Sequence, residues 1–140
     1  MTAKEYLGQV RKAEQELIAI SAKKRHYLDL AQAIGAKMSS TVVQASGNGS
    51  KTETAAIGLY EMTKLLDEKE KEYVDMVKKA EETIAKIKQE KFRQILTLRY
   101  LCRWSWKSIQ DEMGYKDQKS TYRCHGYALR ELQKIMEGVI

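Results

Sequence analysis

Apolar residues recur from Tyr6 to Met38 at alternating steps of three and four positions. The stripe consists of Tyr6, Val10, Ala13, Leu17, Ile20, Tyr27, Ala31, Ile34 and Met38, with Lys24 filling the one missing turn. This spacing places the apolar side chains on one narrow face of a helix and leaves the charged residues between them in water. The pattern predicts a long amphipathic helix from Ala3 to Met38, which would span about 50 Å at ~1.5 Å per residue.

A second stripe of the same period begins near Glu53 or Thr54. Its members are Leu59, Met62, Leu66, Tyr73, Met76, Ala80, Ile84 and Ile87, and Lys69 interrupts it. Between the two stripes, residues 39–54 include the run Ser46-Gly-Asn-Gly-Ser50, which lowers helix propensity and offers little to bury. We therefore expect a flexible loop at about 39–54. The two helices then either fold back as an antiparallel helical hairpin or pair with another chain in a homo-oligomer.

The second stripe continues into the last third of the chain. Its further members are Phe92, Ile95, Leu96, Leu98, Tyr100 and Leu101. Because the period persists, we expect little or no linker at this point. The chain is accordingly divided into a helical hairpin arm at residues 1–90 and a C-terminal domain at residues 91–140.

Helix-capping residues divide this C-terminal domain into three helices joined by two turns. A break is expected around Cys102 to Trp104, because Ser105 is a good N-cap for a helix from Trp106 to Met113. Gly114 is a candidate left-handed C-cap for that helix. Asp117 is a suitable N-cap for a last helix from Gln118 to about Met136.

The helical period also separates the inward from the outward side chains of this domain. The expected core is Leu98, Leu101, Trp106, Ile109, Met113, Tyr115, Thr121, Cys124, Ala128 and Leu132. The opposite face of the last helix then presents cations, amide and hydroxyl donors, and aromatic rings, which can contact bases in a DNA major groove. The candidates for DNA contact are Gln118, Lys119, Ser120, Tyr122 and Arg123. The candidates for backbone phosphates are Arg103, Lys107, Lys116, Tyr127 and Arg130.

Composition supports an all-helical chain. No proline occurs, while Ala, Leu, Lys, Glu and Gln are abundant, so long helices with few irregular connections are expected. No apolar run approaches the ~20 residues that cross a bilayer, and charged Lys4 and Glu5 stand where a signal peptide needs an apolar core. We expect a cytoplasmic protein with no membrane association. Cys102 and Cys124 fit neither a CxxC nor a metal-ligand spacing and are expected to be reduced and mostly buried.

Most of the net charge of +6 belongs to the C-terminal domain. Residues 91–140 contain ten Lys and Arg against five acids, a net +5, whereas residues 1–90 contribute only +1. A basic excess confined to one domain is typical of proteins that bind polyanions, although a charge excess alone often marks a solvated surface.

Residue patterns of catalytic and metal sites are absent from the sequence. Neighbours on a helix diverge by about 100°, so His125 is poorly placed to activate Cys124. We find no paired carboxylates, Ser/His/Asp pattern or metal motif, and the spacing around Lys51 does not fit a phosphate-binding GxxxxGK[ST] loop. No enzymatic activity, cofactor or metal is expected. Trp104 and Trp106 are expected to pack against the domain, the alternative being stacking on bases.

Four runs of the C-terminal domain carry a resemblance to a known family. They are Leu96-Thr-Leu-Arg-Tyr100, Ser105-Trp-Lys-Ser-Ile109, Met113-Gly-Tyr115 and Ala128-Leu-Arg-Glu-Leu132. Together they resemble region 4 of sigma-70 type factors, and more closely the ArpU/RinA-like late-gene transcription regulators of phages and prophages of Gram-positive bacteria. The resemblance covers about residues 90–136. It implies a helix-turn-helix that binds double-stranded promoter DNA through its last helix, and contact with RNA polymerase.

The sequence thus predicts an all-α transcription regulator in which a helical hairpin arm precedes a helix-turn-helix of sigma region 4 type. Two other classes stay open. One is a phage DNA-packaging accessory that resembles a small terminase subunit, although in that family the DNA-binding part usually comes first. The other is a helical interaction protein whose basic end is incidental and which does not bind DNA.

Overall fold

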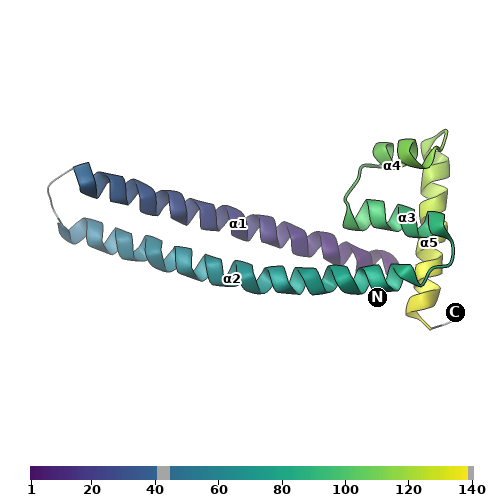
Figure 1. The fold of residues 1–140 in the computed structure, drawn as a ribbon, viewed down its shortest axis with the longest axis horizontal. Helices are drawn as coiled ribbons and strands as arrows, with labels where there is room; N and C mark the ends of the chain where they lie inside the picture. Colours follow the sequence, from purple (N-terminus) through teal and green to yellow (C-terminus); the bar gives the residue numbers. More distant parts are fainter. Residues whose placement is uncertain (41–44, 139–140) are drawn as a thin grey trace. The chain divides into compact units, whose positions relative to one another are not determined.

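Helices account for nearly all of the described chain. The computed structural model describes residues 1–40 and 45–138, with side chains described at 1–35 and 51–138. The elements are α1 (Ala3–Ser40), α2 (Ala45–Ala85), α3 (Glu90–Leu96), the π-helical segment η1 (Thr97–Leu101), α4 (Trp106–Met113) and α5 (Gln118–Met136) (Figure 1). The described residues include no strand, which confirms the all-α prediction. Within these ranges, no helix combines the length and the apolar character that crossing a membrane requires.

The predicted loop at 39–54 is wrong over most of its length. Helix α1 extends to Ser40 and α2 begins at Ala45, so the Ser-Gly-Asn-Gly-Ser run is helical, and the rest of the expected loop, residues 41–44, lies outside the described residues. A glycine in a helix costs about 1 kcal/mol relative to alanine. Extending an existing helix adds one hydrogen bond for each residue fixed, whereas starting one is costly, so a long helix can continue through such a run.

The chain also breaks where continuity was expected. Helix α2 ends at Ala85 and α3 begins at Glu90, with a four-residue connection between them. The Arg93 guanidinium donates to the carbonyl oxygens of Ile87 and Lys88 at 2.5 and 2.9 Å, which satisfies backbone acceptors that the break leaves without helical partners. Ile87 itself is buried. Burial of Ile87 and the reach of Arg93 hold a turn that the apolar period alone does not reveal.

Contacts divide the chain into two compact units. One consists of Gln15–Glu72, and the other combines Met1–Glu14 with Tyr73–Ile140. Each unit therefore contains parts of both α1 and α2.

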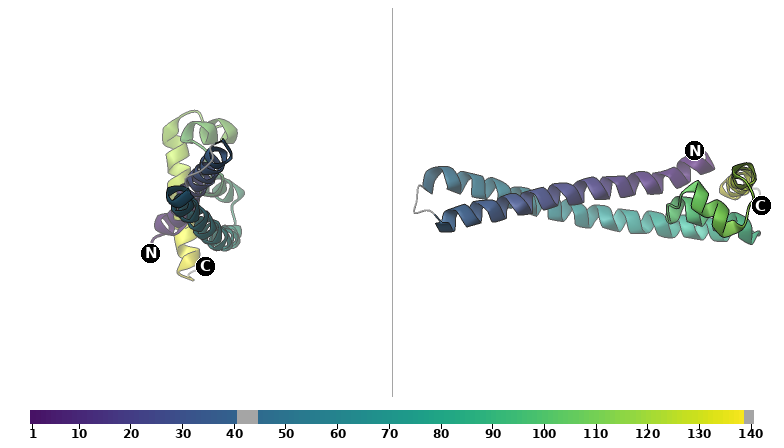
Figure 2. Two further views of the ribbon diagram at one scale, coloured as in Figure 1. Left: turned by 90° about the vertical axis from the view of Figure 1, so that its left-hand side faces the viewer. Right: turned by 90° about the horizontal axis from the view of Figure 1, so that it is seen from above.

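In the unit of Gln15–Glu72, segments of α1 and α2 lie along each other (Figures 1 and 2). Tyr27 contacts Gly58, and farther toward the start of α1 Glu16 pairs with Lys69 at 3.9 Å. The earlier residue of α1 contacts the later residue of α2, so the two segments are antiparallel. Lys69 is half-buried and also pairs with Glu72 at 3.4 Å, so the interruption of the apolar stripe is an ion-paired position.

Gly58 sets how closely α1 and α2 approach in this unit. It is buried, and a Cβ at its position would overlap the ring of Tyr27. Ile20 and Ala55 are buried in the same unit. The glycine on α2 thus leaves space for the aromatic ring of α1, which lets the apolar faces of the two helices pack against each other.

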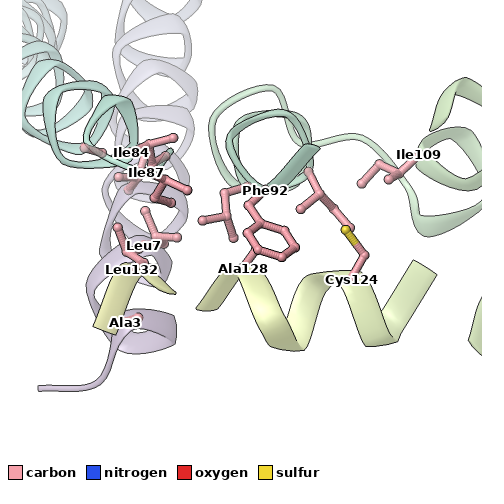
Figure 3. Packing of buried hydrophobic residues seen from close by; sticks show 13 residues of the cluster. Ala3, Leu7, Ile84, Ile87, Phe92, Ile109, Cys124, Ala128 and Leu132 are labelled. Atoms are coloured by element: carbon pink, nitrogen blue, oxygen red, sulfur yellow. The ribbon is translucent and has the colours of Figure 1, made fainter. Parts of the chain in front are cut away.

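The second unit has a core centred on α5. Thr121, Cys124, Ala128 and Leu132 are all buried, which confirms the predicted inward face of this helix. Phe92 lies over α5 between Cys124 and Ala128 (Figure 3). Ile95, Leu96 and Ile109 are fully buried in the same cluster, whereas the other expected core members, Leu98, Leu101, Trp106, Met113 and Tyr115, are partly buried around it.

The core of this unit extends beyond the predicted C-terminal domain. Its further buried members come from the start of α1 and the end of α2: Ala3, Leu7, Val10, Ala80, Ile84 and Ile87. Leu132, Leu7 and Ala3 belong to this one buried cluster (Figure 3). In addition, the backbone N–H of Ala3 donates to Oε1 of Gln133 at 2.6 Å. The hydrophobic core therefore does not stop at residue 90.

His125 connects α5 to η1 and to α4 through polar and aromatic contacts. Its Nε2 lies 2.8 Å from the Tyr100 hydroxyl, and its ring meets the edge of Trp106 at a centroid distance of 4.7 Å. Burial, followed by the positive charges of Lys4 and Arg99, lowers the pKa of His125 from 6.5 to about 4. The imidazole is therefore neutral at neutral pH.

The contact between Gly58 and Tyr27 predicts a coupled effect of two substitutions. In an open helix, Gly→Ala stabilises by about 1 kcal/mol. Gly58→Ala should give no such gain in the wild type, because the added methyl group meets the Tyr27 ring. In a Tyr27→Ala background the gain should return. Urea unfolding of the four proteins measures the coupling.

Gly8→Ala is the matched control for this cycle. A Cβ at Gly8 would have no neighbour within 4 Å, so its effect should be the same with and without Tyr27. Equal effects of Gly58→Ala in both backgrounds would mean that the helices do not approach closely at this point.

His125 predicts a specific loss of stability in mild acid. The unfolded chain binds a proton at this ring below pH 6.5, whereas the folded protein resists it until about pH 4. The stability that the neutral imidazole contributes is therefore complete above pH 6.5, and it is lost as the pH falls from 6.5 to about 4. The ring is only partly buried, so solvent screening limits the loss to about 1–2 kcal/mol.

Unfolding free energies at pH 7 and pH 4.5 test this expectation. His125→Gln should be less stable at pH 7, because it lacks the imidazole contacts, and should lose less stability on acidification than the wild type. His26→Gln replaces the other, exposed histidine and should behave as the wild type does. An unchanged pH dependence in His125→Gln would contradict the assignment.

Candidate functional site

Local hydrogen bonds set where α5 begins. The carboxylate of Asp117 accepts from the backbone N–H of Ser120 at 2.8 Å, and this bond lowers the pKa of Asp117. Asp117 is therefore the N-cap that the sequence predicts, and it stays ionised at the positive end of the helix dipole.

The preceding helix is fixed in the same manner at both ends. Ser105 Oγ accepts from the N–H of Ser108 at 3.1 Å, and Gly114 ends α4 in the left-handed conformation with φ of 74°. Both predicted caps are confirmed. Tyr115 follows directly, and its hydrogen bond to the Cys124 thiol, together with burial, raises the pKa of Tyr115 to about 12. The turn is thus attached to the buried face of α5.

The side chains proposed for DNA contact lie mainly on the exposed side of α5. Gln118, Lys119, Tyr122 and Arg123 are exposed and Ser120 is half-exposed. The structure therefore places all five in the first six positions of the helix, opposite the buried stripe. Because consecutive residues differ by about 100°, Lys119 lies near the centre of this face, with Tyr122 and Ser120 on its two flanks.

Tyr122 belongs to an aromatic contact with α4. Its ring meets Trp106 edge-on at a centroid distance of 5.1 Å, and the Arg99 guanidinium lies over Trp106 at 4.4 Å. Trp106 therefore packs within the domain, as the sequence predicts. Trp104 differs, since its side chain is exposed. The two tryptophans thus have different environments despite their closeness in sequence.

The five proposed phosphate contacts fall into two groups. Lys107, Lys116, Tyr127 and Arg130 are exposed, and the pair of Lys107 with Asp111 at 3.5 Å is itself in solvent and easily exchanged. Arg103 instead pairs with Glu14 of α1 at 2.8 Å. Glu14 is only 16% exposed, so a phosphate would compete with a well-placed carboxylate for this guanidinium.

Arg103 also has an unusual backbone. Its φ is 60°, in a region that residues other than glycine seldom adopt. The side chain of Glu14 also hydrogen-bonds to Tyr73, whose pKa is raised by burial and by the nearby Glu14 charge. Arg103 is thus better explained as a connection between the turn before α4 and the parts of α1 and α2 that belong to the same unit.

A groove between α3 and α5 contains a residue that the sequence did not indicate. It has a volume of about 190 Å³, and its lining includes Lys91, Phe92, Ser120, Arg123 and Tyr127. Lys91 precedes a buried residue at the start of α3, and its ammonium lies 5.4 Å from the centre of the Phe92 ring. No sequence pattern links Lys91 to Arg123, because only the packing of α3 on α5 brings them to one groove.

A second hollow lies on the α4 side. It measures about 450 Å³ and is lined by Trp104, Ser108, Asp111 and Glu112. Its two carboxylates would repel a polyanion, so this hollow is a poor phosphate site.

The Cys124 thiol and the His125 imidazole have different partners. Cys124 is buried and hydrogen-bonded with Tyr115, whereas His125 contacts Tyr100. Cys102 is exposed, in contrast to the expected burial, and both thiols are free. Among residues 1–40 and 45–138, no cluster of three or more His, Cys, Asp or Glu side chains is arranged to hold a metal ion.

No family model matches this sequence, and comparisons with curated proteins and with solved structures give no match either.

Proposed function

We propose that this protein is a sequence-specific DNA-binding transcription regulator. In this proposal α4 and α5 form a helix-turn-helix of sigma region 4 type, and α5 is the recognition helix that enters the major groove of promoter DNA. Late-gene control in a phage or prophage and contact with RNA polymerase are the roles that the resemblance of residues 90–136 implies. No catalytic step is part of the proposal.

The observation that carries the proposal is the two-sided character of α5. Its buried side carries small or medium-sized, mostly apolar side chains, and the exposed residues among the first six positions of the helix include Lys119, Tyr122 and Arg123. An α-helix fits the major groove of B-DNA, where Lys and Arg donate to guanine and hydroxyl groups reach bases or phosphates. Recognition helices contact bases chiefly with their N-terminal residues, which is where these side chains lie.

Gly126 gives independent support. It lies in the middle of α5, where a glycine costs about 1 kcal/mol relative to alanine. A Cβ at this position would have no neighbour within 4 Å, so internal packing does not require the glycine. From the helical period it belongs to the same exposed face as Lys119. A residue without a side chain there allows a bulky partner to approach the helix backbone closely.

The arm of the proposed regulator is built from α1 and α2. Within the unit of Gln15–Glu72 the two helices pair in antiparallel register through Tyr27 and Gly58. In the other unit, the Tyr6 hydroxyl lies 3.2 Å from Oγ1 of Thr83, again matching an early α1 residue with a late α2 residue. These contacts favour a hairpin formed within one chain over pairing of the same stripes between chains.

Duplex binding by a double variant tests the proposed recognition face. DNA is first selected from a random duplex pool with the wild-type protein. Lys119→Ala combined with Arg123→Ala should then weaken binding to the selected duplex by at least about tenfold, since even one charged contact that reads a base is worth about 1–3 kcal/mol. Fluorescence anisotropy at fixed salt measures the change.

The control removes two cations elsewhere. Arg25→Ala combined with Lys71→Ala lowers the net charge equally, and both of these side chains are exposed in the unit of Gln15–Glu72. This control should bind the selected duplex nearly as well as the wild type. Unchanged binding by the α5 variant would show that the face is wrong, and failure of the wild type to enrich any sequence would refute specific DNA recognition.

A further inference from the structure

We propose that the groove between α3 and α5 binds one phosphate of the DNA backbone, and that Lys91 and Arg123 hold it together. This inference rests on the proposed function and specifies part of its interface. It adds a residue from α3 to that interface, and it assigns Arg123 to the backbone rather than to base recognition.

The groove has the chemical character of a small anion site. Two cations, Lys91 and Arg123, line it from different helices, and Ser120 and Tyr127 add hydroxyl groups. A phosphate accepts hydrogen bonds from all four of these groups, and those from the two cations are charge-assisted. The lining residues Phe92 and Cys124 are buried and apolar, whereas Lys91 and Arg123 are exposed, so an anion would bind on the solvent side of the groove.

Both cations are available to an external anion. In the part of the chain that the structure describes, neither Lys91 nor Arg123 forms a salt bridge. The charge of Asp117 interacts with that of Arg123, but the Asp117 carboxylate is hydrogen-bonded to the N–H of Ser120 as the helix cap. Arg103 provides the contrast, since its guanidinium is occupied by Glu14.

The size of the groove restricts what it can bind. Its volume of about 190 Å³ lies below the roughly 300–1,000 Å³ of pockets that enclose drug-sized ligands. A single phosphate group is of suitable size, whereas a whole nucleotide would extend beyond the groove. One phosphodiester group of a DNA strand could occupy the groove, because the sugars and bases attached to it would lie outside.

The position of the groove matches a DNA strand beside a recognition helix. Ser120, Arg123 and Tyr127 follow each other along α5 at steps of three and four, so they form one flank of the exposed face. Tyr122, which contacts Trp106, marks the opposite flank. A helix in the major groove has phosphates along its flanks and base edges beneath its centre. Lys119 is therefore placed to contact base edges, and the Lys91–Arg123 groove is placed to contact the DNA backbone.

Salt-dependent binding of single and double variants tests this assignment. Lys91→Ala and Arg123→Ala should each lower affinity by roughly tenfold, and by the same factor for the selected duplex and for unrelated DNA, because a phosphate contact is blind to sequence. The plot of log affinity against log salt should become shallower in the double variant, because no cation then neutralises the phosphate, and each single variant should change the slope less. Since both cations face one phosphate, the double variant should lose about 0.9 in slope, the value for one contact, rather than twice that.

Lys79→Ala is the control, because it removes an exposed cation from α2 in the same unit. It should leave the slope unchanged, and circular dichroism should show all variants folded. Three results would overturn the inference while leaving DNA binding intact: an unchanged affinity for Lys91→Ala, an altered sequence preference for Arg123→Ala, or a loss of slope near twice 0.9 for the double variant. Absence of DNA binding by the wild type would overturn the proposed function as well.

Inorganic phosphate distinguishes a strand from a free anion. Isothermal titration of the wild type with phosphate should show no saturable binding at micromolar concentration, because one isolated ion lacks the contacts that the rest of the duplex supplies. Tight phosphate binding that is lost in the Lys91→Ala variant would identify a free-anion site and overturn the assignment to DNA.

Discussion

Burial of one face of α5 is the constraint on which the rest of the C-terminal helices depends. Thr121, Cys124, Ala128 and Leu132 offer only small or medium-sized side chains, so neighbouring helices can approach closely and cover them with larger ones such as Phe92. Once this stripe is buried, the helical period leaves no choice about which residues face outward. The chemistry of the exposed side is thus determined by the packing of the opposite side.

The features predicted correctly are those that short stretches of chain determine. Ser105, Gly114 and Asp117 each act through hydrogen bonds or backbone angles within a few residues, so their identities and spacing were sufficient to place both ends of α4 and the start of α5. The inward face of α5 likewise follows from a period that a single helix contains. The exposed positions of Lys119 and Arg123 are a direct consequence of that face.

The features missed depend on residues far apart in sequence. The break before α3 arises because Ile87 is buried and Arg93 donates a hydrogen bond to its carbonyl group. The sequence at this point has no proline or glycine that would indicate a break. The same holds for Arg103 and Glu14, which no local pattern connects, and for Lys91, whose relation to Arg123 exists only after α3 packs on α5. At Ser46–Ser50 the error is of another kind, since local propensity was overruled by continuation of a long helix.

The bond between the N–H of Ala3 and Gln133 joins residues separated by nearly the whole chain, and the core around it combines both ends of the sequence. Contacts of such large separation require closure of a long loop before any of them is made, which slows folding. On a ribosome, the first turns of α1 would emerge long before Leu132 is synthesised. The apolar side chains of Leu7 and Val10 would therefore lack these core partners until α5 has been synthesised.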